Sequence, residues 1–301
     1  MKTHFALTVA VLACLSLAAP MFAQDSKPTS RGTSKPTSQK AKTPKHINPV
    51  VLIKTSLGDI ELELFELQAP KTVANFIALA EGSKEFTDAK TRQKVKRPFY
   101  DGLNFHRCMS NFMAQGGCPL GNGGGDPGYS FEDEINATSF GYHKEKMMVN
   151  DRPHQIMGRV NPSTWQSKIM QPIFDSLNIK NQTDLDAKRT EVKDKIAAMT
   201  LLEGLECMGY RYNDKLPAST KPKKGTIAMA NSGPNTNGSQ FFISVVDNDY
   251  LAGKHTVFGK VTKGYKLVEK IVELGDSNKT SPPQLTKIIS IRLLKAASKK
   301  K

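Results

Sequence analysis

The sequence predicts a mainly β protein in which a closed antiparallel sheet carries two packed helices. Three observations predict this class. Several short runs alternate apolar with polar residues, one run with helical spacing stands near each end of the region 47–294, and a last alternating run follows the second helix. This order of strands, helix, strands, helix and strand is typical of a barrel closed by helical plugs.

The first element is a predicted hairpin over residues 51–64. Its apolar positions alternate with charged residues, and Ser56–Asp59 separates the two runs. This period of two indicates strands with one wet face. The apolar positions are Val51, Ile53, Ile60, Leu62 and Leu64.

The two helices follow from spacing and end signals. Pro70 opens the first helix and Gly82 closes it, with apolar residues at i, i+3, i+4 and i+7 between them. Leu267–Val272 repeats this spacing before Pro282 and Pro283 stop the second helix. A final strand is predicted over 285–294. Its alternation places three apolar residues on one face: Ile289, Ile291 and Leu293.

The first 23 residues are typical of a secretory signal peptide. Lys2 precedes an apolar stretch, and Met21–Ala23 offers a small-residue cleavage site before Gln24. The sequence therefore predicts export to the periplasm or beyond. An alternative remains open, because Val11–Cys14 resembles a lipoprotein signal in which Cys14 would be acylated. Cleavage after Ala23 leaves an odd set of three cysteines, hence at most one internal disulfide.

The formal net charge of +15 lies mostly in two tails. Residues 24–46 carry +5 and contain a repeated Ser-Lys-Pro-Thr-Ser motif, which predicts a disordered basic linker. Residues 295–301 form a basic tail of +4. The remaining region has an ordinary charge, so no specific nucleic-acid partner is expected.

Composition and motifs exclude several other classes. With 38% hydrophobic residues, 22 Gly and 17 Pro among 301, the chain is neither collagen-like nor wholly disordered. A mean hydropathy of −0.42 predicts no transmembrane span after the first segment. There is no phosphate-binding loop, metal spacing of histidines or Gly-x-Ser-x-Gly elbow, so no metal or other cofactor is expected. The glycine run 121–125 indicates a flexible turn.

Two segments stand out as carriers of chemistry. The first is 105–117, Phe-His-Arg-Cys-Met-Ser-Asn-Phe-Met-Ala-Gln-Gly-Gly, and the second is 229–243, Met-Ala-Asn-Ser-Gly-Pro-Asn-Thr-Asn-Gly-Ser-Gln-Phe-Phe-Ile. Each of their residues alone is ordinary, since a single strand arginine is usually a surface residue and an Asn/Gly/Ser run is usually a turn. Together the segments resemble the cyclophilin family of peptidyl-prolyl cis-trans isomerases.

The resemblance covers residues 50–136 and 223–294, including Phe131–Glu134 and Gly253–Gly259. It implies an eight-stranded antiparallel β-barrel capped by two α-helices. It also implies an enzyme that isomerises Xaa-Pro bonds in proline-containing polypeptide clients and assists the folding of exported proteins.

The resemblance implies a set of site residues. Arg107 would be the catalytic residue, and Gln115 would position Arg107 and the substrate carbonyl. Four residues would wall the pocket for the substrate proline, with His255 at its edge. These are Phe112, Met113, Phe242 and Leu251.

Further residues would bind the peptide beside the proline. Ala230 and Asn231 would offer backbone and side-chain groups, and Gln240 would line the adjoining groove. Where most family members carry Trp, this chain has Tyr250. Tyr keeps an aromatic face, so we expect activity to survive and cyclosporin binding to be weakened.

The family pattern is interrupted between about residues 137 and 222. Leu185, Val192 and later apolar residues at helical spacing predict one helix, with Thr183 and Asp184 as its cap. Trp165 and the apolar residues after it predict a second helix. A mostly helical insertion, arranged as a helical hairpin, is the simplest interpretation. Shorter inserts at this point occur in exported bacterial family members, which favours a bacterial source.

Two other functions stay open from the sequence. The barrel could recognise proline-containing segments without turnover, as a binding module or chaperone. The protein could instead interact with partners through its basic linker and tail. A monomer is expected in each case.

Overall fold

The computed structural model describes residues 46–158, 160–279 and 283–294. The predicted signal peptide, nearly all of the linker 24–46 and the basic tail lie outside these residues. The strands are β1 Val50–Thr55, β2 Gly58–Leu64, β3 Phe86–Thr87, β4 Lys94–Val95, β5 Arg107–Met109, β6 Met113–Gly116, β7 Met148–Val149, β8 Arg152–Pro153, β9 Thr226–Met229, β10 Phe241–Ser244, β11 Val257–Lys263 and β12 Ile288–Leu293.

The α-helices are α1 Pro70–Ala80, α2 Pro162–Trp165, α3 Gln171–Ser176, α4 Gln182–Ala187, α5 Arg189–Ala198, α6 Leu201–Cys207 and α7 Tyr265–Gly275. Short helical turns are η1 Ala137–Phe140, η2 Gln155–Met157 and η4 Asp249–Leu251, and η3 Gln166–Met170 is a π-helical turn.

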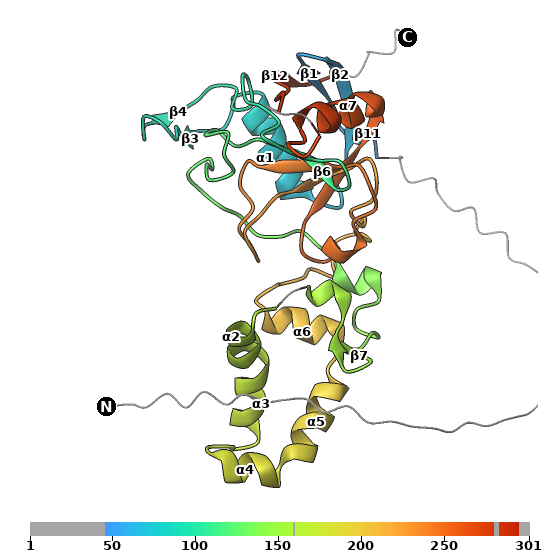
Figure 1. Ribbon diagram of the computed structural model, residues 1–301. Helices are drawn as coiled ribbons and strands as arrows, with labels where there is room; N and C mark the ends of the chain where they lie inside the picture. The colour runs from blue at the N-terminus through green and yellow to red at the C-terminus, as the bar shows by residue number, and fades with distance from the viewer. Residues whose placement is uncertain (1–45, 159, 280–282, 295–301) are drawn as a thin grey trace, which may run out of the picture. The chain divides into compact units, whose positions relative to one another are not determined.

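Eight strands form one antiparallel sheet in the order β12-β1-β2-β11-β9-β10-β6-β5 (Figure 1). Its two edges meet just before β5 and β12. There the Phe105 amide donates to the Thr286 carbonyl at 3.0 Å, and the Ile288 amide donates to the Leu103 carbonyl at 2.7 Å. The predicted eight-stranded barrel is confirmed.

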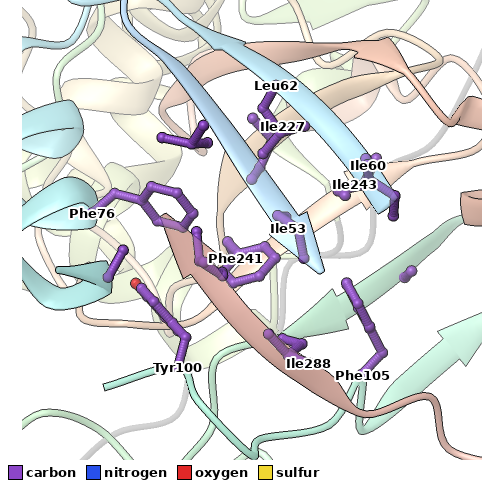
Figure 2. Close-up of a cluster of buried hydrophobic side chains, with 14 of the residues drawn as sticks. Ile53, Ile60, Leu62, Phe76, Tyr100, Phe105, Ile227, Phe241, Ile243 and Ile288 are labelled. Carbon is purple, nitrogen blue, oxygen red and sulfur yellow. The ribbon is translucent and has the colours of Figure 1, made fainter. Parts of the chain in front are cut away.

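The interior of the sheet is filled by apolar side chains from most strands and from both predicted helices, α1 and α7. Figure 2 shows the part of this core around Phe76 of α1 and Phe241 of β10. Phe76 of α1 meets the ring of Phe241 edge-on, with centroids 5.5 Å apart. Val268 and Ile271 of α7 are fully buried in the same core. Close packing of this kind fixes the sheet to which the site residues are attached.

The last strand differs from its prediction. Ile288 and Ile291 are fully buried, whereas Ile289 and Leu293 are 54% and 40% exposed. The register explains this, because Lys54 pairs with Ser290 and Thr55 pairs with Ile288. Ile289 is thus the extra residue of a β-bulge, which shifts the alternation by one residue and places Ile288 on the same buried face as Ile291.

The insertion contains several short helices rather than two long ones. The run predicted as one helix is divided into α4, α5 and α6, and Asn181 caps α4 in place of Thr183. The run around Trp165 is a single helical stretch, α2-η3-α3. It widens to a π turn just before Pro172, which lacks the amide needed for a regular bond.

Hydrogen bonds close the base of the insertion onto the barrel. The Asn213 amide donates to the Ile135 carbonyl at 2.9 Å. Asn136 donates through its amide to Ser219 Oγ at 2.8 Å and through Nδ2 to the Leu216 carbonyl at 2.8 Å. The first and the last part of the insertion therefore lie side by side where the insertion leaves the barrel.

Two smaller findings concern loops and thiols. Residues 84–97 contain the two-stranded β3-β4 hairpin. Cys108 and Cys118 are buried, Cys207 is partly buried, and all three are free. Burial raises the pKa of the Cys108 thiol to about 12, so this thiol stays protonated.

Candidate active site

The hairpin β5-β6 holds Arg107 and Gln115 side by side. The two residues face each other directly in the antiparallel register, so their side chains point to the same side of the sheet. Arg107 Nη1 donates to Gln115 Oε1 at 3.3 Å, and the guanidinium carbon lies 5.9 Å from the centre of the Phe112 ring. The guanidinium is exposed and has further N–H groups for a ligand.

A buried carboxylate fixes the turn of this hairpin. Asp276, just after α7, accepts from the Ser110 amide at 2.8 Å and from the Ser110 hydroxyl at 2.7 Å. These bonds, with one from the Asn278 amide, lower the pKa of Asp276 to about 2. The turn that carries Phe112 is therefore held by a permanently charged acceptor.

An apolar cluster lies beside Arg107, and we call its partly exposed face the apolar pocket. Met113 and Phe242 are buried in its floor with Ala228 and Val257. Phe112, Ala230 and Leu251 pack against this floor and stay partly exposed, as does Phe65, which sequence reasoning missed. Phe65 directly follows the first hairpin, and its apolar character was the only available signal.

We call residues 249–255 the rim segment, because they border this pocket. Tyr250 is 45% exposed, and its ring centre lies 6.3 Å from that of Phe112. The His255 ring meets Phe242 edge-on at 5.6 Å, with Nδ1 3.0 Å from the Met229 carbonyl oxygen. Burial lowers the pKa of His255 to about 4, so the imidazole is neutral at physiological pH.

The loop 231–237 is organised around the buried Asp133. Asp133 accepts from Asn237 Nδ2 at 2.7 Å and from the Asn235 amide at 2.9 Å. Asn235 adopts a left-handed conformation with φ of 58°, which asparagine tolerates well. This network sets the path of the backbone after Ala230 and Asn231.

A polar groove adjoins the apolar pocket. Gln115 Nε2 donates to Gln240 Oε1 at 2.9 Å, and Gln240 Nε2 donates to the carbonyls of Gly123 and Gly125 at 2.7 and 2.9 Å. The glycine run that the sequence indicated as a flexible turn is thus tied to the site. The cavity has a volume of about 700 Å³ and is lined also by Ala230 and Asn231.

The structure brings all predicted site residues around one pocket and groove. Together they offer a charged hydrogen-bond donor beside a partly exposed apolar surface on which a small ring can pack, and an open groove that can take extended peptide. Among the described residues no group of three or more His, Cys, Asp or Glu could hold a metal ion. In the same residues, no helix is long and apolar enough to cross a membrane.

Comparison with known proteins agrees with this geometry. A family model described as cyclophilin type peptidyl-prolyl cis-trans isomerase/CLD matches residues 50–293. Peptidyl-prolyl cis-trans isomerase B of Streptomyces anulatus is 33% identical over 233 residues, covering 77% of this chain and 87% of that protein. A probable peptidyl-prolyl cis-trans isomerase A of Mycobacterium leprae (strain TN) is 30% identical over 248 residues, covering 82% and 92%.

A solved structure of a cyclophilin type peptidyl-prolyl cis-trans isomerase from Cryptosporidium parvum is 22% identical, with a TM-score of 0.47. It covers 83% of this chain and 99% of that one. The family match includes both motif segments and the whole barrel. The chain therefore belongs to the cyclophilin-type peptidyl-prolyl cis-trans isomerase family, whose members bind proline-containing substrates and isomerise the peptide bond before proline.

Proposed function

We propose that this isomerase acts on Xaa-Pro bonds of exported proteins, with Arg107 as its catalytic residue. The observation that carries the assignment to Arg107 is its guanidinium, which is exposed, held by Gln115 and next to the apolar pocket. A proline ring in that pocket has its imide nitrogen near the guanidinium.

The chemistry requires only that the imide lose its double-bond character. The barrier to rotation is ~18–20 kcal/mol, because the nitrogen lone pair is delocalised into the carbonyl. A hydrogen bond from Arg107 to the prolyl nitrogen localises that pair as the bond twists. The pocket keeps water from competing for the same nitrogen. Gln115 restrains the guanidinium, so little reorganisation is needed.

The rate enhancement that this mechanism has to supply is within the range of such a site. Uncatalysed exchange takes ~10–100 s, and millisecond exchange requires an acceleration of about 10⁴–10⁵, equivalent to roughly 5.5–7 kcal/mol. A charged hydrogen bond in a dry site, together with tighter binding of the twisted form, supplies energies of this order.

The test is cis-trans exchange of a short Ala-Pro-Phe peptide, measured by NMR. We expect the Arg107→Ala variant to lose activity by about a hundredfold or more and to unfold at the same temperature as the native chain. Arg189→Ala, which removes an exposed arginine of the insertion, is the matched control and should retain full activity. Wild-type exchange with Arg107→Ala would remove Arg107 from the mechanism.

The exported location is supported by the signal-like first 23 residues. Expression in a bacterial host followed by fractionation and intact-mass measurement tests it. We expect a periplasmic protein that begins at Gln24. A mass with an acylated Cys14 at the N-terminus would indicate a lipoprotein instead, and a full-length cytoplasmic chain would contradict export.

We also propose that Tyr250 weakens cyclosporin binding. Tyr250 lies on the pocket rim with 45% of its surface exposed, where the family usually has the larger and more apolar Trp. Tyr250→Trp should bind cyclosporin about tenfold more tightly or better, in a titration followed by calorimetry, while peptide exchange changes little. Equal affinities of the two proteins would contradict this role.

A further inference from the structure

The rim segment contacts the insertion as well as the barrel. The turn η2 of the insertion lies against η4, which carries Tyr250 and Leu251. Tyr212, also from the insertion, donates its hydroxyl to the Gly253 carbonyl at 2.8 Å. Burial raises the pKa of Tyr212 well above its usual range, so the hydroxyl stays protonated and remains a donor.

Gly253 is shaped for these contacts. Its φ of 78° lies in the left-handed region, and an added Cβ would lie only 2.8 Å from Cε2 of Tyr142. The ring of Tyr142 is almost fully buried at this place. Two tyrosines of the insertion therefore contact Gly253, at a backbone position that only glycine can occupy without strain.

The position of Gly253 matters for the pocket. It stands between Leu251 and His255, two residues placed around the substrate proline, so movement of its backbone displaces both. The next residue, Lys254, accepts a hydrogen bond through its carbonyl from Asn231 Nδ2 at 3.0 Å. The same short segment thus links the apolar pocket to the polar groove.

Asn248, the residue just before the rim segment, is held both by the last residue of the insertion and by the barrel. The Asn248 amide donates to the Pro222 carbonyl at 2.8 Å, and Asn248 Nδ2 donates to the Phe112 carbonyl at 3.3 Å. Tyr212 itself is anchored, because the neighbouring Asn213 amide bonds to Ile135 at the base of the insertion. The far half of the rim segment is therefore held from a fixed point outside the barrel.

We propose that the insertion braces the substrate pocket, with Tyr212 and Tyr142 as positioning residues that hold Gly253 and so set the spacing of Leu251 and His255. This inference rests on the proposed function, in which that pocket receives the substrate proline. The brace gives the insertion a role in substrate binding although none of its residues needs to touch the peptide.

The test compares Tyr212→Phe with Tyr210→Phe in the chain 24–301. The rings of Tyr210 and Tyr212 stack with centres 6.4 Å apart, and within the described ranges the Tyr210 hydroxyl makes no hydrogen bond. Each variant removes one hydroxyl and keeps its ring, but only the Tyr212 change releases Gly253. Two quantities are measured: kcat and KM for peptide exchange, and amide hydrogen exchange of a peptide spanning 248–256.

For Tyr212→Phe we expect a three- to tenfold loss in kcat/KM, mainly through a higher KM, with faster amide exchange in 248–256 and a melting temperature lowered by at most a few degrees. Tyr210→Phe should match the native chain in every measurement. Native amide exchange in Tyr212→Phe overturns the brace, and so does native kcat/KM.

Failure of the underlying proposal gives a different pattern. If Arg107→Ala keeps native activity, the catalytic assignment fails, while the amide exchange of Tyr212→Phe still reports whether the insertion holds the rim segment. If the segment loosens and peptide affinity does not change, the brace does not serve this pocket.

Discussion

His255 is the residue at the pocket whose charge depends most on the fold. Its pKa is about 4 in the folded protein, against about 6.5 for an exposed histidine, because burial disfavours the imidazolium. The nearby Lys254 charge acts in the same direction, and the Met229 carbonyl opposes it only in part. The imidazole thus acts at the pocket edge as a neutral, partly apolar ring.

This lowered pKa predicts a pH-dependent stability. Between pH 6.5 and 4 the unfolded chain binds a proton at His255 that the folded chain does not, so acid favours unfolding. The neutral His255 costs the folded protein no stability above pH 6.5. As the pH falls from 6.5 toward 4, the free energy of unfolding decreases by at most about 3 kcal/mol. Urea unfolding at several pH values should show a shallower decline for His255→Gln than for the native chain. Parallel declines would contradict the assignment.

Much of the site at the residue scale was predicted from two motif segments, and the reason lies in their combination. Arg107, Phe112 or Asn231 alone fits an ordinary surface, core or turn position. Sequence reasoning missed Phe65 and also gave no role to the buried carboxylates Asp276 and Asp133. Their hydrogen bonds to Ser110 and Asn235 span 166 and 102 positions and come from backbone amides, so no local pattern in the sequence indicates them.

At the scale of elements, periodicity located helices and strands better than it assigned their faces. The hairpin β1-β2 and the helix α1 follow their patterns closely. Strand β12 does not, because the bulge at Ile289 depends on pairing with β1 and is invisible in the strand itself. In the insertion, the breaks between α4, α5 and α6 come from local caps such as Thr200, which begins α6 with a capping box.

Helix α1 illustrates a cap supplied from far along the chain. Its N-cap residue Ala69 has no side-chain acceptor. Instead Glu134, which is 6% exposed, accepts from the amides of Lys71 and Thr72 at 2.9 and 2.7 Å. The carboxylate thereby joins α1 to the segment that enters the insertion.

Loss of this cap should destabilise the protein measurably. We expect Glu134→Ala to lower the free energy of unfolding by about 1–3 kcal/mol, because the buried Thr72 amide and the partly buried Lys71 amide lose a charged acceptor. Glu132→Ala is the matched control, since it removes an exposed ion pair with Lys71 and should cost less than about 1 kcal/mol. Urea denaturation of both variants measures the difference. Equal losses in the free energy of unfolding would show that the Glu134 cap stabilises the protein no more than the exposed ion pair does.

At the scale of the whole molecule, charge and chemistry are carried by different parts of the chain. Residues 24–46 and 295–301 hold +9 of the net +15, whereas every predicted site residue lies between 107 and 255. The sequence alone identifies this division, since it needs only counting. How the insertion meets the pocket could not be predicted, because the contact of Tyr212 with Gly253 joins residues 41 positions apart through their folded geometry.

Removal of both basic stretches should therefore separate catalysis of peptide isomerisation from binding to polyanions. We expect residues 47–294 to keep the kcat/KM of residues 24–301 for a neutral peptide, at low and at high salt. Binding to heparin, used as a polyanion probe, should be present only in the longer chain and should weaken with salt. Loss of catalysis in the shorter chain would show that the basic stretches take part in folding or in the site.

The pairing of β1 with β12 has a consequence for engineering. The Leu294 amide donates to the Val50 carbonyl at 2.8 Å, so the domain starts and finishes at adjacent points. A short peptide could join these points into a circle without disturbing the sheet, and new termini could be cut at the exposed Lys180–Asn181 turn. Such a circular permutant would carry the same active site with its ends moved to the outer tip of the insertion, where a fusion partner could be attached.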